Sequence, residues 1–304
     1  MVEIRTQRTY SVEHPPGYVD GRLFSAADEP IVLRTDFDVE AYQAEAKGYM
    51  DIDEFEGPPA KLDSAVGRDL AFVWRLESTA LAETRAMLSS WTANEARITA
   101  FIATWAFERY WMARASRDLL EQAGVPTGAL RKPSLTGRVR DTYVERILPL
   151  VSPVLGGAVK EPITAGHMAR MAIQEGAIDA AQTALLDRLT GKARTVLETV
   201  IARRVPMLDF FRTEATTRIS RSRPEELSAA FHVAAPWSPL RSVGVPDPDE
   251  ETALTSIFGS TQSWRRLVDS GRVVGRLLPG EPQPGVTQVR RAFSRQQQRQ
   301  RMRY

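Results

Sequence analysis

The stretch WTANEARITAF, Trp91 to Phe101, opens the helical segment that decides the fold. From here, apolar side chains recur at intervals of three and four residues, which predicts an amphipathic helix from about Ala93 to Gln122. Glu95 falls on the stripe of this helix that should face the core, and Ile98 follows on the same stripe. A buried carboxylate needs a metal ion, a counter-charge or a proton, because burying it alone is costly.

Three further segments show the same helical period. We predict helices over about Lys61–Leu88, Thr164–Leu189 and Lys192–Ser220, the last of them kinked at Pro206. Convincing alternation with a period of two residues is missing. The sequence therefore predicts an all-α protein, a four-helix bundle with one crossover connection, flanked by an irregular N-terminal arm and a C-terminal appendage.

The chain divides into four predicted parts. Shorter helices are expected near Asp38–Met50 in the N-terminal region, in the connector RDTYVERILPLV (residues 140–151), and near 250–258 and 262–277. The parts are an irregular N-terminal arm (1–60), the bundle (61–221), an appendage with short helices (222–289) and a basic, disordered tail (290–304).

Composition places the chain among ordinary globular proteins. Hydrophobic residues make up 43% of its 304 residues, and cysteine is absent, which excludes disulfides, thiolate metal sites and a cysteine nucleophile. There is no apolar run of about 18 residues and no signal-peptide pattern at the N-terminus. We expect a cytoplasmic protein without a membrane span.

The basic charge is concentrated at the C-terminus. Residues 290–304 hold six arginines and no acid, whereas the rest of the chain has 34 basic and 38 acidic residues, a net charge of −4. Such a tail suits a solvated end or an anionic partner such as nucleic acid.

Charged residues interrupt the apolar stripes of the predicted helices at comparable places. Three stripes carry Glu77, Glu95 and Glu175, and the fourth carries Arg204. Three acids and a base in one bundle predict a shared polar core.

The residues around these positions resemble those of the acyl-acyl-carrier-protein desaturases, a ferritin-like family. KLDSAVGRDLAFVWRLES (61–78) is similar to their first bundle helix and AIQEGAIDAA (172–181) to the third. WTANEARI (91–98) resembles their second-helix motif, in which a tryptophan precedes Glu-x-x-His, and IARRVPMLDFFR (201–212) is similar to the fourth-helix segment that bears a second such motif. The resemblance covers roughly residues 61–215.

The resemblance implies a ferritin-like fold, a homodimer, an acidic acyl-carrier-protein partner and an apolar channel for an acyl chain. In that family four glutamates and two histidines hold two irons that activate dioxygen. This chain departs from that pattern, because Ile98 stands at the first histidine and Arg204 and Met207 occupy the second Glu-x-x-His. The resemblance therefore implies a degenerate diiron site.

We hypothesise that Arg204 replaces the metal and pairs with Glu95 and Glu175, while Ile98 and Met207 fill the remaining space. The short hairpin between the first two helices offsets Glu77 from Glu95 by about 15 Å, which leaves the membership of Glu77 open. The expected protein has no cofactor and acts as a non-redox binding or scaffolding protein for an acyl or other apolar ligand.

Alternative functions remain open at this point. One is an iron-dependent oxidase or desaturase with unrecognised ligands, or an ion held by acids alone, such as Glu108, Asp179 or Asp209. Another is a metal-free enzyme in which buried Glu95 or Glu175 serves as general base.

Overall fold

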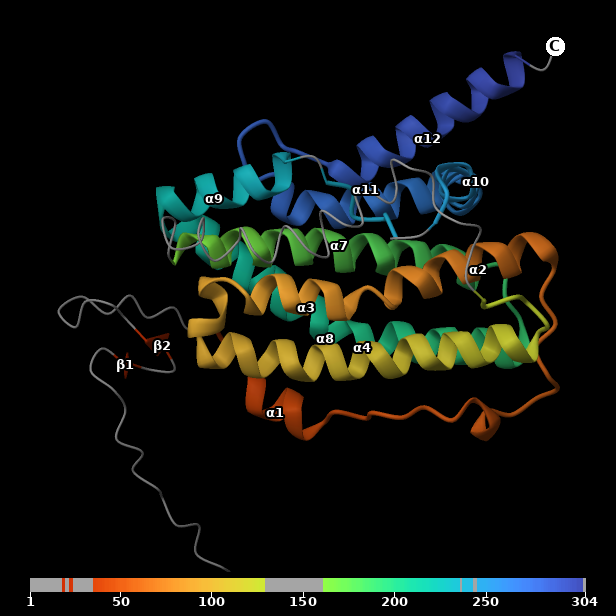
Figure 1. The fold of residues 1–304 in the computed structure, drawn as a ribbon, viewed down its shortest axis with the longest axis horizontal. Coiled ribbons are helices and arrows are strands. Elements are labelled where there is room, and N and C mark those ends of the chain that lie inside the picture. Colours follow the sequence, from red (N-terminus) through yellow and green to blue (C-terminus); the bar gives the residue numbers. More distant parts are fainter. Residues whose placement is uncertain are drawn as a thin grey trace, which may run out of the picture.

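The structure, a computed structural model, describes residues 35–128, 161–235, 237–242 and 245–302, together with the backbone of two short strands. These strands, β1 (Tyr18–Val19) and β2 (Arg22–Leu23), form an antiparallel pair. All other elements in the described residues are helical, so the all-α class is confirmed (Figure 1). The helix predicted within residues 140–151 lies outside the described residues.

Four helical segments surround the core. They are α2 (Ser64–Glu77), α4 (Ala96–Gln122), α7 (Pro162–Leu186) and α8 (Gly191–Arg221). Helices α2 and α8 each contact both α4 and α7, so the four segments form a closed ring around a common interior (Figure 1). Each segment thus contributes buried apolar residues to the same core.

The first predicted helix, 61–88, is in fact two helices. Helix α2 ends at Glu77, and α3 (Ala80–Leu88) begins after a break at Ser78 and Thr79. The Thr79 hydroxyl donates to the carbonyl of Leu76 at 2.7 Å, and the Ser78 hydroxyl donates to the carbonyl of Trp74 at 3.0 Å. Hydroxyl side chains that bind the backbone in this way compete with continued helix, which explains the break.

Helix α8 passes Pro206 as one continuous element, so the proline does not divide it. The proline removes one backbone donor from the helix, and the kink expected there stays a prediction.

The N-terminal arm contains α1 (Val39–Ala44) and a short 3-10 helix, η1 (Ile52–Glu54). Helix α1 is shorter than the predicted helix over 38–50. Its N-cap is Asp38, whose side chain accepts from the backbone N–H of Ala41, and the buried side chain of Tyr42 packs in the core.

The C-terminal region is more helical than predicted. Helices α10 (Asp247–Ile257) and α11 (Thr261–Gly275) match the two expected short helices. Helix α9 (Arg223–Ala234) and helix α12 (Pro284–Arg301) were not predicted.

The prediction of a disordered tail is wrong, because α12 continues through it and extends away from the other helices (Figure 1). Val286, Val289 and Ala292 are buried at the start of α12, and Arg295 and Arg299 contact Glu251 on α10. Two of these buried apolar residues, Val286 and Val289, come before residue 290 and so lie outside the segment that was predicted as a tail.

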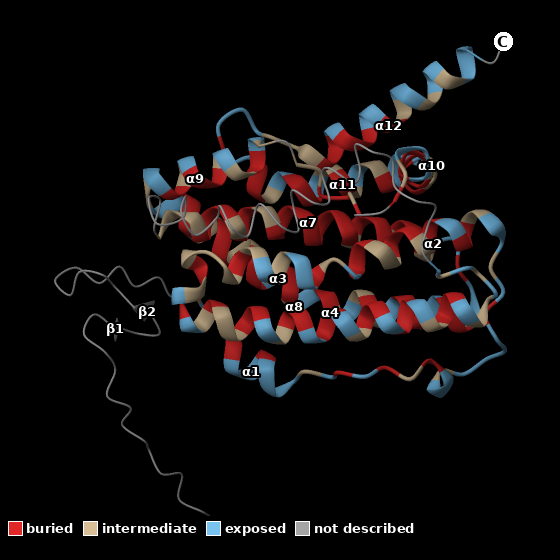
Figure 2. Ribbon diagram, in the orientation of Figure 1, coloured by how far each residue is buried: buried red, intermediate tan, exposed pale blue. Residues whose placement is uncertain are grey.

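Helix α7 occupies the centre of the molecule. It contacts α8, α9 and α11 as well as α2, and its residues are buried on nearly all sides (Figure 2). The C-terminal helices α9 and α11 therefore cover α7, as expected of an appendage that packs on the bundle. None of the described helices combines the length and apolarity that a membrane span requires.

Candidate functional site

Four charged side chains meet in the interior, one from each of the four core segments. Glu77 ends α2, Arg109 lies on α4, Glu175 on α7 and Arg204 on α8, and all four side chains are 0% exposed. We call these four residues the charge ring. Its two carboxylates and two guanidiniums have a net charge of zero.

The contacts of the charge ring alternate between acid and base. Each carboxylate gives one oxygen to each guanidinium: Glu77 contacts Arg204 through Oε1 and Arg109 through Oε2. Glu175 contacts Arg109 through Oε1 and Arg204 through Oε2. Each carboxylate thus bridges two cationic groups.

Neutral groups satisfy much of the remaining hydrogen-bonding capacity. The Gln182 amide donates to Glu77 Oε1 at 2.7 Å and accepts from Arg204 Nε at 3.0 Å. The Trp105 indole donates to Glu175 Oε1 at 3.2 Å. Such partners are what allow charges to stay in a desolvated interior.

Arg109 also explains how the end of α2 is stabilised. Its Nη2 donates to the carbonyls of Leu76 and Glu77, each at 3.0 Å. The last carbonyls of a helix lack partners within that helix, and a cationic side chain satisfies them well. Through Arg109 the charge ring therefore also stabilises the backbone at the end of α2, where the chain breaks before α3.

Burial shifts the pKa values of Glu175 and Arg204 in the direction that favours their uncharged forms. It raises the pKa of the Glu175 carboxyl, while Arg109 and the Trp105 indole act in the opposite direction. Burial also lowers the pKa of Arg204 to about 9, a value at which the guanidinium stays protonated at neutral pH. The geometry is that of a neutral ion-pair network.

Glu95 does not join the charge ring, so the predicted Glu95–Arg204 pair is wrong. Glu95 has extended backbone dihedrals between the 3-10 helix η2 (Trp91–Asn94) and α4, and it is therefore not on the stripe of α4. Arg218 donates to Glu95 Oε1 at 3.0 Å and to Oε2 at 2.6 Å. Glu77 and Glu95 thus belong to different networks, and the acid that lies apart from Arg204 is Glu95.

Arg218 organises a second buried network, which we call the Glu95–Arg218 network. Its Nε donates to Glu214 Oε2 at 3.1 Å, and Arg97 and the Thr35 hydroxyl bind the other oxygen of Glu214. These contacts fasten the start of α4 and the residues before α1 to the C-terminal part of α8.

Ile98 and Met207 are both buried in the hydrophobic core, 1% and 0% exposed. Their predicted role in filling space beside Arg204 stays a prediction. The sequence analysis missed Arg109, although it falls on the α4 stripe four residues after Trp105 and three before Met112.

A diiron centre of the kind that the resemblance implies does not fit these residues. All four oxygens of Glu77 and Glu175 face guanidiniums, and the two positions that would need histidine hold Ile98 and Met207. A metal ion would have to displace an arginine to reach either carboxylate.

The described residues contain no cluster of other acids that could bind a metal ion. No group of three or more His, Asp or Glu side chains is arranged there to hold an ion. Glu108, one of the alternative ligands, accepts from the backbone N–H of Gly48 through Oε1 and lies 3.7 Å from Arg203 through Oε2.

Two histidines lie together near the start of α7, where His167 of α7 meets His232 of α9. The rings of His167 and His232 are 5.5 Å apart, and Nδ1 of His167 lies 2.9 Å from the Thr92 hydroxyl. Burial, with the charges of His232 and Arg170, lowers the pKa of His167 to about 3, so it is neutral at physiological pH. A neutral pair held in this way is consistent with a packing role.

The aromatic residues of α4 separate into two groups. Trp105 is buried with its ring 5.6 Å from that of Phe211, whereas Phe107 and Tyr110 are 49% and 53% exposed. The homodimer that the resemblance implies stays a prediction.

Comparisons with protein-family models, with curated proteins and with solved structures find no match.

Proposed function

We propose that this chain is a ferritin-like bundle, related to the acyl-acyl-carrier-protein desaturases, whose polar core is structural and which acts as a non-redox binding or scaffolding protein. The observation that supports this best is the bridging of Arg109 and Arg204 by both Glu77 and Glu175. Two bridging carboxylates between two cationic groups have the charge pattern of a dimetal centre, with guanidiniums in place of ions.

The same contacts argue against a buried general base. Glu175 and Glu95 are 0% and 4% exposed, and each accepts hydrogen bonds from a guanidinium. Each carboxylate is therefore engaged by a guanidinium and shielded from solvent, which leaves it poorly placed to take a proton from a substrate.

Iron analysis tests the proposal. Protein from iron-supplemented cultures, washed with a chelator, is expected to retain far less than one iron per chain and to show no ferric absorption after ferrous iron and dioxygen are added. The reason is that guanidiniums already neutralise the interior acids. Stoichiometric iron that survives the wash would overturn the proposal and favour the oxidase or desaturase alternative.

A second candidate function, binding of nucleic acid, is favoured by the outer face of α12. Arg290, Arg291 and Arg301 are exposed on this helix, and the chain has no acid from 290 onward. At 100° per residue these three arginines lie on one side of α12, together with Ser294 and Gln298. Cations and amides in a row suit a phosphate backbone.

Neutralising this face should weaken binding to duplex DNA in a salt-dependent way. The triple change Arg290→Gln, Arg291→Gln and Arg301→Gln is expected to make the slope of log affinity against log salt shallower by about 2–3, because about three phosphate contacts are lost. Fluorescence anisotropy at several salt concentrations measures the slope. Arg265→Gln, an exposed change on α11, is the control. An equal slope for the triple variant and the control would exclude this function.

A further inference from the structure

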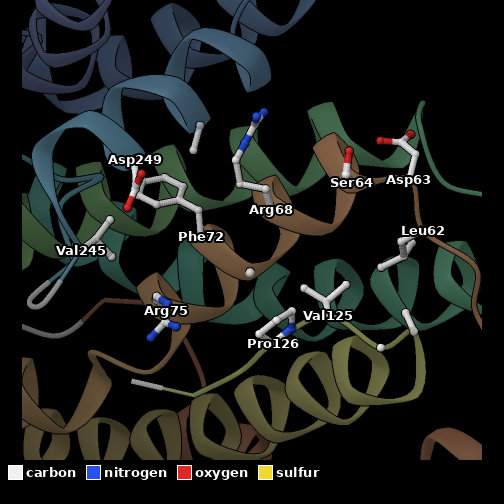
Figure 3. Close-up of a pocket in the computed structure, with 14 residues that line it drawn as sticks. Leu62, Asp63, Ser64, Arg68, Phe72, Arg75, Val125, Pro126, Val245 and Asp249 are labelled. Carbon is white, nitrogen blue, oxygen red and sulfur yellow. The ribbon is translucent and has the colours of Figure 1, made fainter. Parts of the chain in front are cut away.

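A pocket of about 530 Å³ lies apart from the charge ring, between α2, the residues that follow α4, and α10. Its volume is within the range of small-molecule sites, roughly 300–1,000 Å³. Phe72 from α2, Val125 and Pro126 from the segment after α4, and Val245 before α10 supply apolar walls (Figure 3).

Four charged residues also line the pocket, and two of them are already engaged. Asp63 is the N-cap of α2 and accepts from the backbone N–H groups of Ala65 and Val66 at 2.8 and 2.9 Å. Arg68 donates to Asp69 from Nε and Nη2 at 3.0 and 2.8 Å. These contacts leave Arg75 and Asp249 to meet a ligand.

Arg75 is the cation that gives the pocket its selectivity. Its Nη2 donates to the carbonyl of Gly128 at 2.9 Å, and its guanidinium lies 4.8 Å from the centre of the Trp74 ring. Among the described residues no carboxylate forms an ion pair with it, and burial, with no contribution from an acid, lowers its pKa. A half-buried guanidinium without a counter-charge favours an anion, since its remaining donors are unused.

Asp249 forms no ion pair with that cation. In Figure 3 the carboxylate of Asp249 and the guanidinium of Arg75 are drawn at separate places on the pocket wall. A ligand whose anionic group binds Arg75 can extend its apolar body along Phe72 and Val125. Its negative charge then stays at Arg75, apart from the carboxylate of Asp249.

We propose that this pocket binds a small organic monoanion with an apolar body, its carboxylate or sulfonate on Arg75 and its apolar part against Phe72, Val125 and Val245. The assignment deepens the proposed binding role and rests on it. The two fail separately, because iron analysis reports on the charge ring and ligand titration reports on the pocket.

Calorimetric titration with octanoate, and with octanol as its uncharged counterpart, tests the assignment. Saturable octanoate binding is expected at one site per chain, with octanol at least about tenfold weaker. Arg75→Gln should weaken octanoate binding by at least about tenfold, the loss expected for one charge-assisted hydrogen bond, and leave octanol binding unchanged.

Two further variants control for folding and for location. Ala71→Phe places a ring in the pocket and should weaken both probes, whereas the exposed change Arg265→Gln should affect neither. Equal octanoate affinity in wild type and Arg75→Gln, or no effect of Ala71→Phe, would overturn the assignment. Absence of saturable octanoate binding to the wild type would do so as well.

Discussion

Replacing Arg204 by methionine is expected to lower the free energy of unfolding by about 3–5 kcal/mol, the typical cost of removing one partner from a buried ion pair. Methionine keeps much of the side-chain volume but leaves Glu77 Oε1 and Glu175 Oε2 without that donor. Gln182 loses a donor too. Arg109 still contacts both acids, but one guanidinium cannot balance two desolvated carboxylates.

Denaturant unfolding followed by circular dichroism measures this loss. The matched control is Arg194→Met on the same helix, whose guanidinium pairs with Glu198 at 2.8 Å while both side chains are about half exposed. Exposed pairs contribute about 0–1 kcal/mol, so the control should unfold almost as wild type does. If Arg204→Met matched the control, the charge ring would not stabilise the core.

The second large effect is expected at Arg218, where methionine should also cost about 3–5 kcal/mol. Both oxygens of Glu95 would lose their guanidinium partner while only 4% of the residue is exposed. Glu214 would keep Arg97 and Thr35. The loss therefore falls mainly on Glu95, at the start of α4.

A double variant separates pairing from packing. Glu95→Met combined with Arg218→Met removes both charges, so it should be less destabilised than Arg218→Met alone. Arg221→Met is the control on the same helix, because Arg221 is 25% exposed and its contacts are 3.5 and 3.7 Å long. A double variant less stable than the single one would show that size, not charge, sets the cost.

Periodicity was sufficient to predict the helical class and the approximate limits of α4, α7 and α8. It also identified Glu77, Glu175 and Arg204 as interior charges. What it could not supply was the axial level of each residue, because that depends on the break at Ser78–Thr79 and on η2. Those two local features decide that Glu77, and not Glu95, lies level with Arg204.

Arg109 was missed for a different reason. Its spacing places it on the α4 stripe, but arginine side chains are seldom fully buried and usually extend to solvent. The helix α12 was missed because composition was judged over 290–304 alone, whereas its buried residues Val286 and Val289 come earlier.

The central place of α7 bears on how the chain is made. During synthesis α7 emerges well before the helices that cover it, because α11 ends at Gly275, roughly 90 residues after Leu186. At about 5–20 residues per second, translation of that interval takes on the order of 5 to 20 s. Until α9 and α11 have been made, the side of α7 that they cover is exposed on the ribosome, so we expect the nascent chain to bind chaperones during that interval.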